Sequence, residues 1–246
     1  MSSIAQPSSQ QTPNWAIVPF SVAYRSSREN VTRLLTDHPE AADIRVPACP
    51  EWTVRDVVAH VLGICYRVAG RTAGVAPSRQ LPGPEAGLAE LLDAWAGSAE
   101  LAETQLDALQ MRRAGILAMD AFTHEIDIFG ALDAPVSEDH PSYPGSMRLV
   151  TSGFTAAAQA RGLSGLRIEA PGAEWTIGQS EPEVTVYGHR HDIFRSLVGR
   201  RTVAQISSLA WSGSPEPWLP AFVWGPFRPP AEAVEGMAGE AVGAAR

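Results

Sequence analysis

The chain has 246 residues, of which 45% are hydrophobic and 19% charged, a composition typical of a globular protein with one large or two modest domains. A formal net charge of −8 excludes a general nucleic-acid-binding protein, because no basic excess is present to neutralise phosphates. Two cysteines are too few for a disulfide framework and fit a reduced, cytoplasmic setting. No apolar run approaches membrane-spanning length.

The N-terminal half predicts a bundle of helices. Residues 1–13 are rich in Ser, Gln and Pro, so we expect a disordered N-terminus without a signal peptide. Between residues 14 and 132, apolar residues at helical spacing predict helices over about 15–37, 53–71, 84–110 and 111–131. Thr53 followed by Asp56 predicts a capping box at the start of the second helix. Four helices joined by loops favour a helical bundle.

The C-terminal half has a different pattern. Proline and glycine mark residues 133–145 as a linker. Residues 146–228 predict a small α+β domain, and residues 229–246, rich in Pro, Ala and Gly, a flexible tail. Within the small domain we expect helices over 146–161 and 191–198 and strands over 166–170, 174–177 and 183–187. The predicted fold class is therefore α+β.

One polar stripe lies on the fourth predicted helix. Asp120, His124 and Asp127 are spaced i, i+4 and i+7, with Thr123 beside them, so they share one side of the helix. His60 on the second helix offers a third ligand beside Asp120 and His124, and such a set suits a divalent metal with an open position. On spacing alone, a salt-bridged surface patch is the favoured explanation of Asp120 and His124, because an Asp and a His at this spacing occur often by chance.

Three segments resemble a known family. Residues 46–60, Val-Pro-Ala-Cys-Pro-Glu-Trp-Thr-Val-Arg-Asp-Val-Val-Ala-His, resemble the P-x-C-P-x-W-x-V-x-D-L-x-x-H element of the mycothiol-dependent maleylpyruvate isomerase family, within the DinB-like superfamily. Asp120, His124 and Asp127 resemble that family's second metal element. Residues 168–200 resemble the small sterol-carrier-like α+β domain that follows the bundle. The resemblance covers roughly residues 15–212.

The resemblance implies a chemistry. It assigns His60, Asp120 and His124 as zinc ligands and mycothiol, a small thiol of actinobacteria, as cosubstrate. Zinc lowers the pKa of a coordinated thiol. The thiolate could add to an activated double bond and leave again, which gives isomerisation, or displace a leaving group on a small electrophilic metabolite, which gives S-transfer. Well-known isomerase members carry Glu where this chain has Asp120, which is shorter by one methylene. All 19 basic residues are Arg and none is Lys, which fits a GC-rich actinobacterial source.

Several further residues are expected near this site. Asp127 is interpreted as a carboxylate that orients a ligand histidine, with Thr123 beside it. Trp52 is expected to pack as a hydrophobic staple against the following helix. Arg200 and Arg201 either bind a carboxylate of the substrate or thiol, or form a solvated helix end.

Two further residues are expected to have no part in the chemistry. Cys49 precedes Pro50 in a loop, and we expect it to pack at the entry to the second helix rather than act as a nucleophile. His140 lies in the predicted linker, and we expect it to be solvated.

Two alternative functions remain open. The first is a divergent DinB-like metalloenzyme of secondary metabolism that does not use mycothiol. The second is a non-catalytic ligand-binding or regulatory module with a vestigial metal site. In each case we expect a monomer or homodimer without nucleic-acid or membrane partners.

Overall fold

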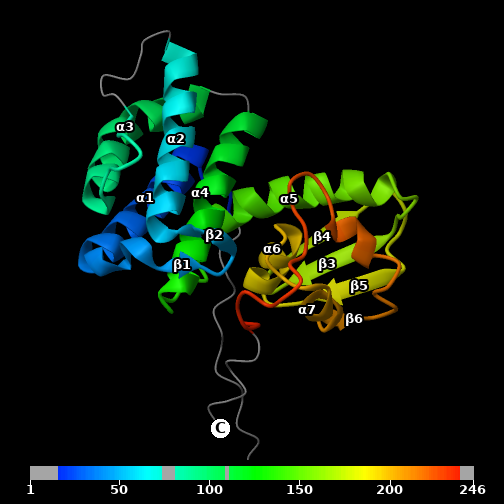
Figure 1. Cartoon of the computed structure of the whole chain (residues 1–246). Helices are drawn as coiled ribbons and strands as arrows, with labels where there is room; N and C mark the ends of the chain where they lie inside the picture. The colour runs from blue at the N-terminus through cyan, green and yellow to red at the C-terminus, as the bar shows by residue number, and fades with distance from the viewer. Residues whose placement is uncertain (1–15, 74–80, 109–110, 239–246) are drawn as a thin grey trace, which may run out of the picture.

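The structure, a computed structural model, describes residues 16–73, 81–108 and 111–238. Figure 1 shows two regions: a group of long helices and a smaller region of strands and short helices, with α5 (Ser142–Gln159) extending from the first into the second. The predicted α+β class with a helical N-terminal region is confirmed. No helix among the described residues is long and apolar enough to cross a membrane.

The helical region contains four of the described helices. These are α1 (Phe20–Asp37), α2 (Val54–Ala73), α3 (Leu88–Ala108) and α4 (Met111–Ala131). α2 packs on α3 and α1 packs on α4, because each helix turns an apolar stripe inward. The core between them includes Val31, Leu35, Val58, Leu62 and Trp95.

The entry to α2 differs from the expected loop. A short 3₁₀ helix, η1 (Pro39–Asp43), and an antiparallel pair, β1 (Arg45–Val46) and β2 (Cys49–Thr53), precede the helix. The predicted capping box is confirmed: the Thr53 backbone donates to Asp56 Oδ2 at 2.9 Å and the Asp56 backbone donates to Thr53 Oγ1 at 3.3 Å. The capping contacts therefore mark the start of α2, directly after β2.

The smaller region is built on a mixed sheet. Among the described residues its strand order is β4 (Ala173–Ile177), β3 (Leu166–Ala170), β5 (Val184–Tyr187) and β6 (Ala210–Trp211). β3 pairs in parallel with β5, and the other pairs are antiparallel. The helices α6 (Arg190–Leu197) and α7 (Val203–Ser207) and the 3₁₀ helix η2 (Leu219–Phe222) complete this region.

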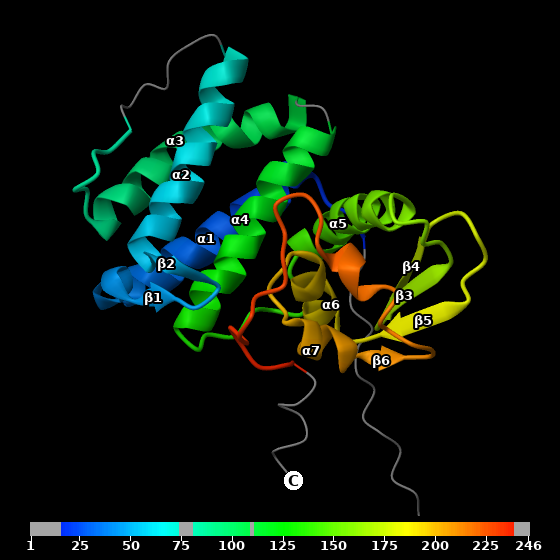
Figure 2. The same cartoon turned by 45° about the vertical axis from the view of Figure 1, so that its right-hand side comes forward.

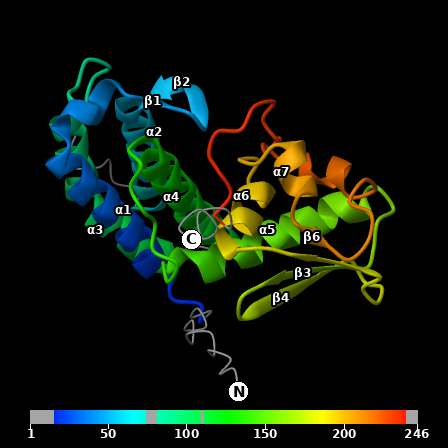
Figure 3. The ribbon, with the colours of Figure 1, turned by 90° about the horizontal axis from the view of Figure 1, so that it is seen from below.

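The boundary between the regions is less open than the predicted linker. α5 begins at Ser142, so the last four residues of the expected linker form its first turn and are buried. In Figure 3, α5 runs from the helical region past the sheet. The second core joins α5 and the strands to Met119, Phe122 and Ile126 of α4. α4 thus contributes to both cores.

His140 is another residue of the expected linker that is buried between the two regions. It is buried rather than solvated as expected: its Nε2 lies 3.1 Å from Glu125 Oε2 and its ring stacks on Phe122 at 4.5 Å. Burial of this imidazole is possible because the carboxylate of Glu125 lies beside it. The segment before α5 is therefore held against α4.

The C-terminal segment has no helix or strand from residue 229 to 238, in line with its composition. It is nevertheless packed: Figure 2 shows this red segment passing between α4 and the α6–α7 side. The Gln205 side chain donates to the Glu235 carbonyl at 2.8 Å, and the Ala238 amide donates to Asp192 at 3.1 Å. The prediction of a loose tail is therefore wrong for residues 229–238; residues 239–246 lie outside the described part.

Candidate metal centre

The fold brings His60, Asp120 and His124 together. His60 lies on α2, and Asp120 and His124 lie one turn apart on α4. Asp120 Oδ2 is 3.7 Å from His60 Nε2, and Asp120 Oδ1 is 3.9 Å from His124 Nε2. One donor atom from each of these residues lies within 4.8 Å of the others. Both histidines thus present the same ring nitrogen to one carboxylate.

This set of donors fits a divalent metal. Zinc takes imidazole nitrogen and carboxylate oxygen at about 2.0–2.2 Å in a tetrahedron, which separates the donors by about 3–4 Å. The separations of 3.7 and 3.9 Å match that requirement. The side chains of His60 and Asp120 are 28% and 26% exposed, whereas His124 is 9% exposed. The centre is therefore open to solvent on the side of His60 and Asp120.

Trp52 covers part of the same site. It lies on β2, and its ring centroid is 4.9 Å from that of His60 and 6.1 Å from that of His124. It also packs against the bundle core, as expected for a residue before α2. Its aromatic face supplies an apolar wall beside both histidines.

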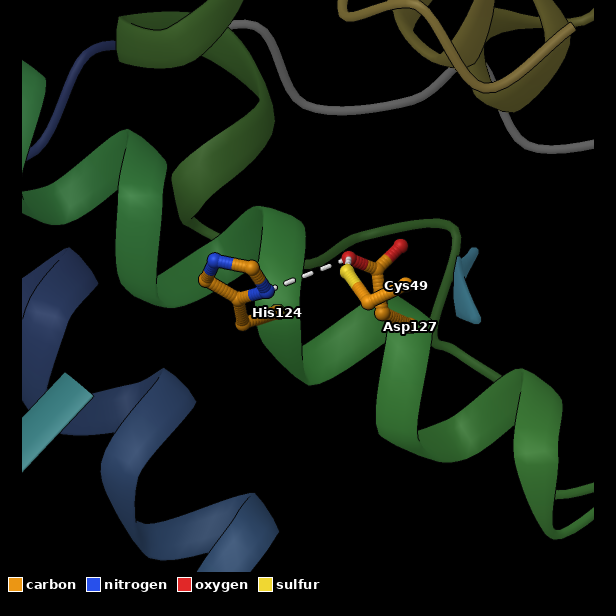
Figure 4. Close-up of side chains that lie close together, drawn as sticks. All are labelled: Cys49, His124 and Asp127. Carbon is orange, nitrogen blue, oxygen red and sulfur yellow. Dashed lines mark hydrogen bonds and ion pairs between the residues drawn. The ribbon is translucent and has the colours of Figure 1, made fainter. Parts of the chain in front are cut away.

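The other side of His124 is a second cluster, made of Cys49, Asp127 and the ring edge that carries Nδ1. Asp127 Oδ2 lies 3.2 Å from His124 Nδ1, and Cys49 Sγ lies 3.7 Å from Asp127 Oδ2. Figure 4 shows Cys49 and Asp127 next to each other, with the dashed contact from Asp127 to His124. These three residues also have suitable donor atoms within 4.8 Å of one another.

Two arginines argue against a metal in this second cluster. Arg195 Nη1 donates to Asp127 Oδ1 at 2.7 Å, and Arg200 Nη2 donates to Asp127 Oδ2 at 2.9 Å. Arg200 Nη2 is also 3.6 Å from Cys49 Sγ. A cation placed here would meet two fixed guanidinium charges at close range, and both carboxylate oxygens are already used. The three residues His60, Asp120 and His124 are therefore the better candidate for a metal centre.

The charges around Asp127 set its protonation and that of His124. Burial raises the pKa of Asp127, but Arg195 and Arg200 outweigh it and hold that pKa well below its usual value. Burial lowers the pKa of His124, but contacts with Asp127 and Cys49 and the Asp127 charge raise it to about 9. Asp127 is thus a permanent anion facing Nδ1, which leaves Nε2 to face Asp120 and His60.

The N-terminal part of the chain is similar to a known protein family. Residues 24–129 match the family model described as the mycothiol maleylpyruvate isomerase N-terminal domain. That region, less than half of the chain, is thus similar to a mycothiol maleylpyruvate isomerase N-terminal domain. It contains every ligand of the candidate centre, as well as Trp52 and Asp127.

Solved structures extend the similarity of fold. A crystal structure of the mycothiol-dependent maleylpyruvate isomerase and one of its histidine-to-alanine mutant have TM-scores of 0.51 and 0.50 with this chain. Each is 15% identical in sequence, and the match covers 78% of this chain and 91% of that one. No curated protein matches. The similarity of fold thus continues beyond residues 24–129 into the α+β region.

The remaining predicted residues are placed as follows. Thr123 is buried, and its hydroxyl donates to the Met119 carbonyl of its own helix at 2.8 Å. The interpretation of Arg200 and Arg201 as a solvated helix end is wrong, because Arg200 contacts Asp127 of α4 and Arg201 is 0% exposed. Arg201 pairs with Asp192 at 2.7 Å, so it has no free face toward a ligand in solvent.

The sequence analysis missed two residues that contact the charged groups beside the candidate centre. Cys49 was expected to pack, yet its sulfur contacts Asp127 and Arg200, and its place in the family element was the available signal. Glu235 pairs with Arg195 and Arg201 from the C-terminal segment. Nothing in the Pro- and Gly-rich sequence around Glu235 signals that role.

Proposed function

We propose that this protein is a divalent-metal-dependent enzyme that uses a small thiol of the mycothiol type to act on a small electrophilic metabolite, as an isomerase or S-transferase. The observation that carries the proposal is the convergence of His60 Nε2, His124 Nε2 and the Asp120 carboxylate on one partly open point. The N-terminal family match and the fold similarity support it.

His60, Asp120 and His124 would hold the metal, and zinc is the ion that this donor set suits best. When bound, the ion would supply a Lewis acid that makes a thiol more acidic. Asp127 lies 3.2 Å from Nδ1 of His124 as its ion-pair partner and would keep the imidazole with Nε2 directed at the centre. Trp52 excludes water from one side of the histidines.

Arg200 is the proposed binding group for an anionic part of the thiol or substrate. Its side chain is 17% exposed, and it reaches the site through Asp127, which it contacts with two of its nitrogens. A guanidinium recognises carboxylates through paired hydrogen bonds. The proposal places this activity in the cytoplasm.

A second candidate function rests on Asp120. Because the well-known isomerases carry Glu at this position, the shorter side chain favours a divergent metalloenzyme of the same scaffold that does not use mycothiol. Titration with mycothiol distinguishes the two: binding that depends on the loaded metal supports the thiol-using enzyme, and its absence supports the divergent one.

The test combines elemental analysis of the purified full chain with a screen for thiol conjugates by mass spectrometry. We expect about one divalent metal per chain. We also expect either a mass shift of the electrophile, from S-transfer, or a product of unchanged mass with a different chromatographic retention, from isomerisation, and each product should require both thiol and metal. His38→Ala serves as a matched control, because His38 is exposed and pairs with Glu40 away from the site. Purified protein without stoichiometric metal, and unable to take up zinc, would contradict the proposal.

A further inference from the structure

Glu235 is a mostly buried carboxylate in a segment without regular structure; its side chain is 19% exposed. Arg195 Nε donates to Glu235 Oε1 at 2.5 Å, and Arg201 Nη1 donates to the same oxygen. Gly130, at the end of α4, lies beside it, since a Cβ added there would be 3.5 Å from Glu235 Oε2. The C-terminal segment is thus tied to both α4 and α6.

Arg195 connects Glu235 to the metal centre. Its Nη1 donates to Asp127 Oδ1 at 2.7 Å while its Nε donates to Glu235, so one buried guanidinium joins the two carboxylates. Asp127 in turn lies 3.2 Å from His124 Nδ1 through its other oxygen. A continuous series of contacts therefore runs from the C-terminal segment to a proposed ligand.

Glu235 also balances charge in this network. Three guanidinium groups meet three carboxylates: Arg195, Arg200 and Arg201 with Asp127, Asp192 and Glu235. His191 Nε2 lies 3.8 Å from Glu235 as well. Without Glu235 the three arginines would face two carboxylates, and a buried unpaired charge is strongly unfavourable. The excess positive charge would act on Asp127, the anion that faces His124.

We propose that Glu235 is a positioning residue for the metal centre: through Arg195 it holds Asp127 against Nδ1 of His124, so that Nε2 is presented to the ion. This inference rests on the proposed function, because it requires the metal to bind at His60, Asp120 and His124. It makes the C-terminal segment part of the support of the centre, although that segment contributes no ligand.

The test is titration of the full chain with cobalt(II), read by visible absorption, for the wild type, Glu235→Gln and Glu235→Asp. Glu232→Gln is the matched control, because Glu232 is an exposed carboxylate of the same segment. Glu235→Gln should weaken cobalt binding by up to about 10-fold, the lower end of the effect of losing a direct partner of a ligand, because Glu235 acts through Arg195 and Asp127, and it should alter the absorption spectrum. Glu235→Asp should recover part of the affinity, and Glu232→Gln should match the wild type.

Thermal melts without metal show whether each variant is folded at the titration temperature. If Glu235→Gln is unfolded there, Glu235→Asp carries the test, and a weakened affinity in the folded protein supports the proposal. Equal affinity and an identical spectrum in the wild type and the folded Glu235 variant would overturn the proposal. Glu235 would then only hold the C-terminal segment in place. A wild type that binds no cobalt overturns the proposed function itself.

Discussion

The two ring nitrogens of His124 face regions of opposite character. Nε2 faces Asp120 and His60, where within the described residues the ion-pair partners of Asp120 are the two histidines. Nδ1 faces Asp127, which is fully buried and paired with two arginines. Both sides contain enough potential ligands for a metal, so counting ligands does not distinguish them. The neighbouring charges do, because a cation is tolerated only where no fixed cation is already present.

The largest effect is expected from removing a ligand on the Nε2 side of His124. His60→Ala should reduce bound zinc from about one per chain to near zero, because two remaining donors on one helix hold zinc weakly. Elemental analysis after dialysis measures the loss. Full retention of zinc in this variant would place the ion on the Cys49 side instead.

The buried residues on the Nδ1 side of His124 should contribute strongly to the free energy of unfolding. Asp127→Asn removes the charge that Arg195 and Arg200 share, and breaking a buried pair in this way costs about 3–5 kcal/mol of unfolding free energy. Urea denaturation of the metal-free protein measures the difference. Asp37→Asn, at the exposed end of α1, is the control and should change little.

The ion pairs of Glu235 with Arg195 and Arg201 should make the stability of the protein depend on pH. Burial raises the pKa of Glu235, but the contacts with His191, Arg195 and Arg201 outweigh it and lower that pKa below its usual 4.5. Its contribution is therefore complete above about pH 4.5 and is lost as the pH falls through the lower folded value. Melting temperatures of the wild type and Glu235→Gln should differ at pH 7 and converge in acid. A constant difference down to pH 3 would contradict this origin.

The smallest effect is expected at Cys49, on the Nδ1 side of His124. Cys49→Ser should leave the zinc content unchanged and alter the unfolding free energy by less than about 1 kcal/mol, because the thiol makes only long contacts with Asp127 and Arg200. Elemental analysis and urea denaturation test both points. Loss of zinc in this variant would show that the thiol is a ligand.

The sequence was informative where local patterns decide the structure. α4 spans Met111–Ala131 as its periodicity predicts, and β3 spans Leu166–Ala170. The i, i+4 spacing on α4 and the element ending at His60 were enough to nominate the three residues that the fold brings together. In each case neighbours in sequence carry the signal.

Long-range charge pairing was not visible in the same way. Arg201 follows a helix end and looked solvated, yet Asp192 and Glu235 enclose it. His140 followed a Pro-containing stretch and looked exposed, yet Glu125 of α4 lies against it. A charged residue is buried when a partner arrives from a distant part of the chain, and local composition contains no record of that partner.

The contribution of α4 to both cores limits how the protein can be divided. Met119, Phe122 and Ile126 pack with α5 and the strands, whereas His124 and Asp120, on the same helix, look toward α2. A fragment cut after residue 132 would keep all three proposed ligands but leave this apolar row in water, where it invites aggregation. The helices that carry the proposed ligands therefore do not form an independent unit. Building the centre into another scaffold would require new apolar contacts for the face of α4 that packs on α5 and the strands.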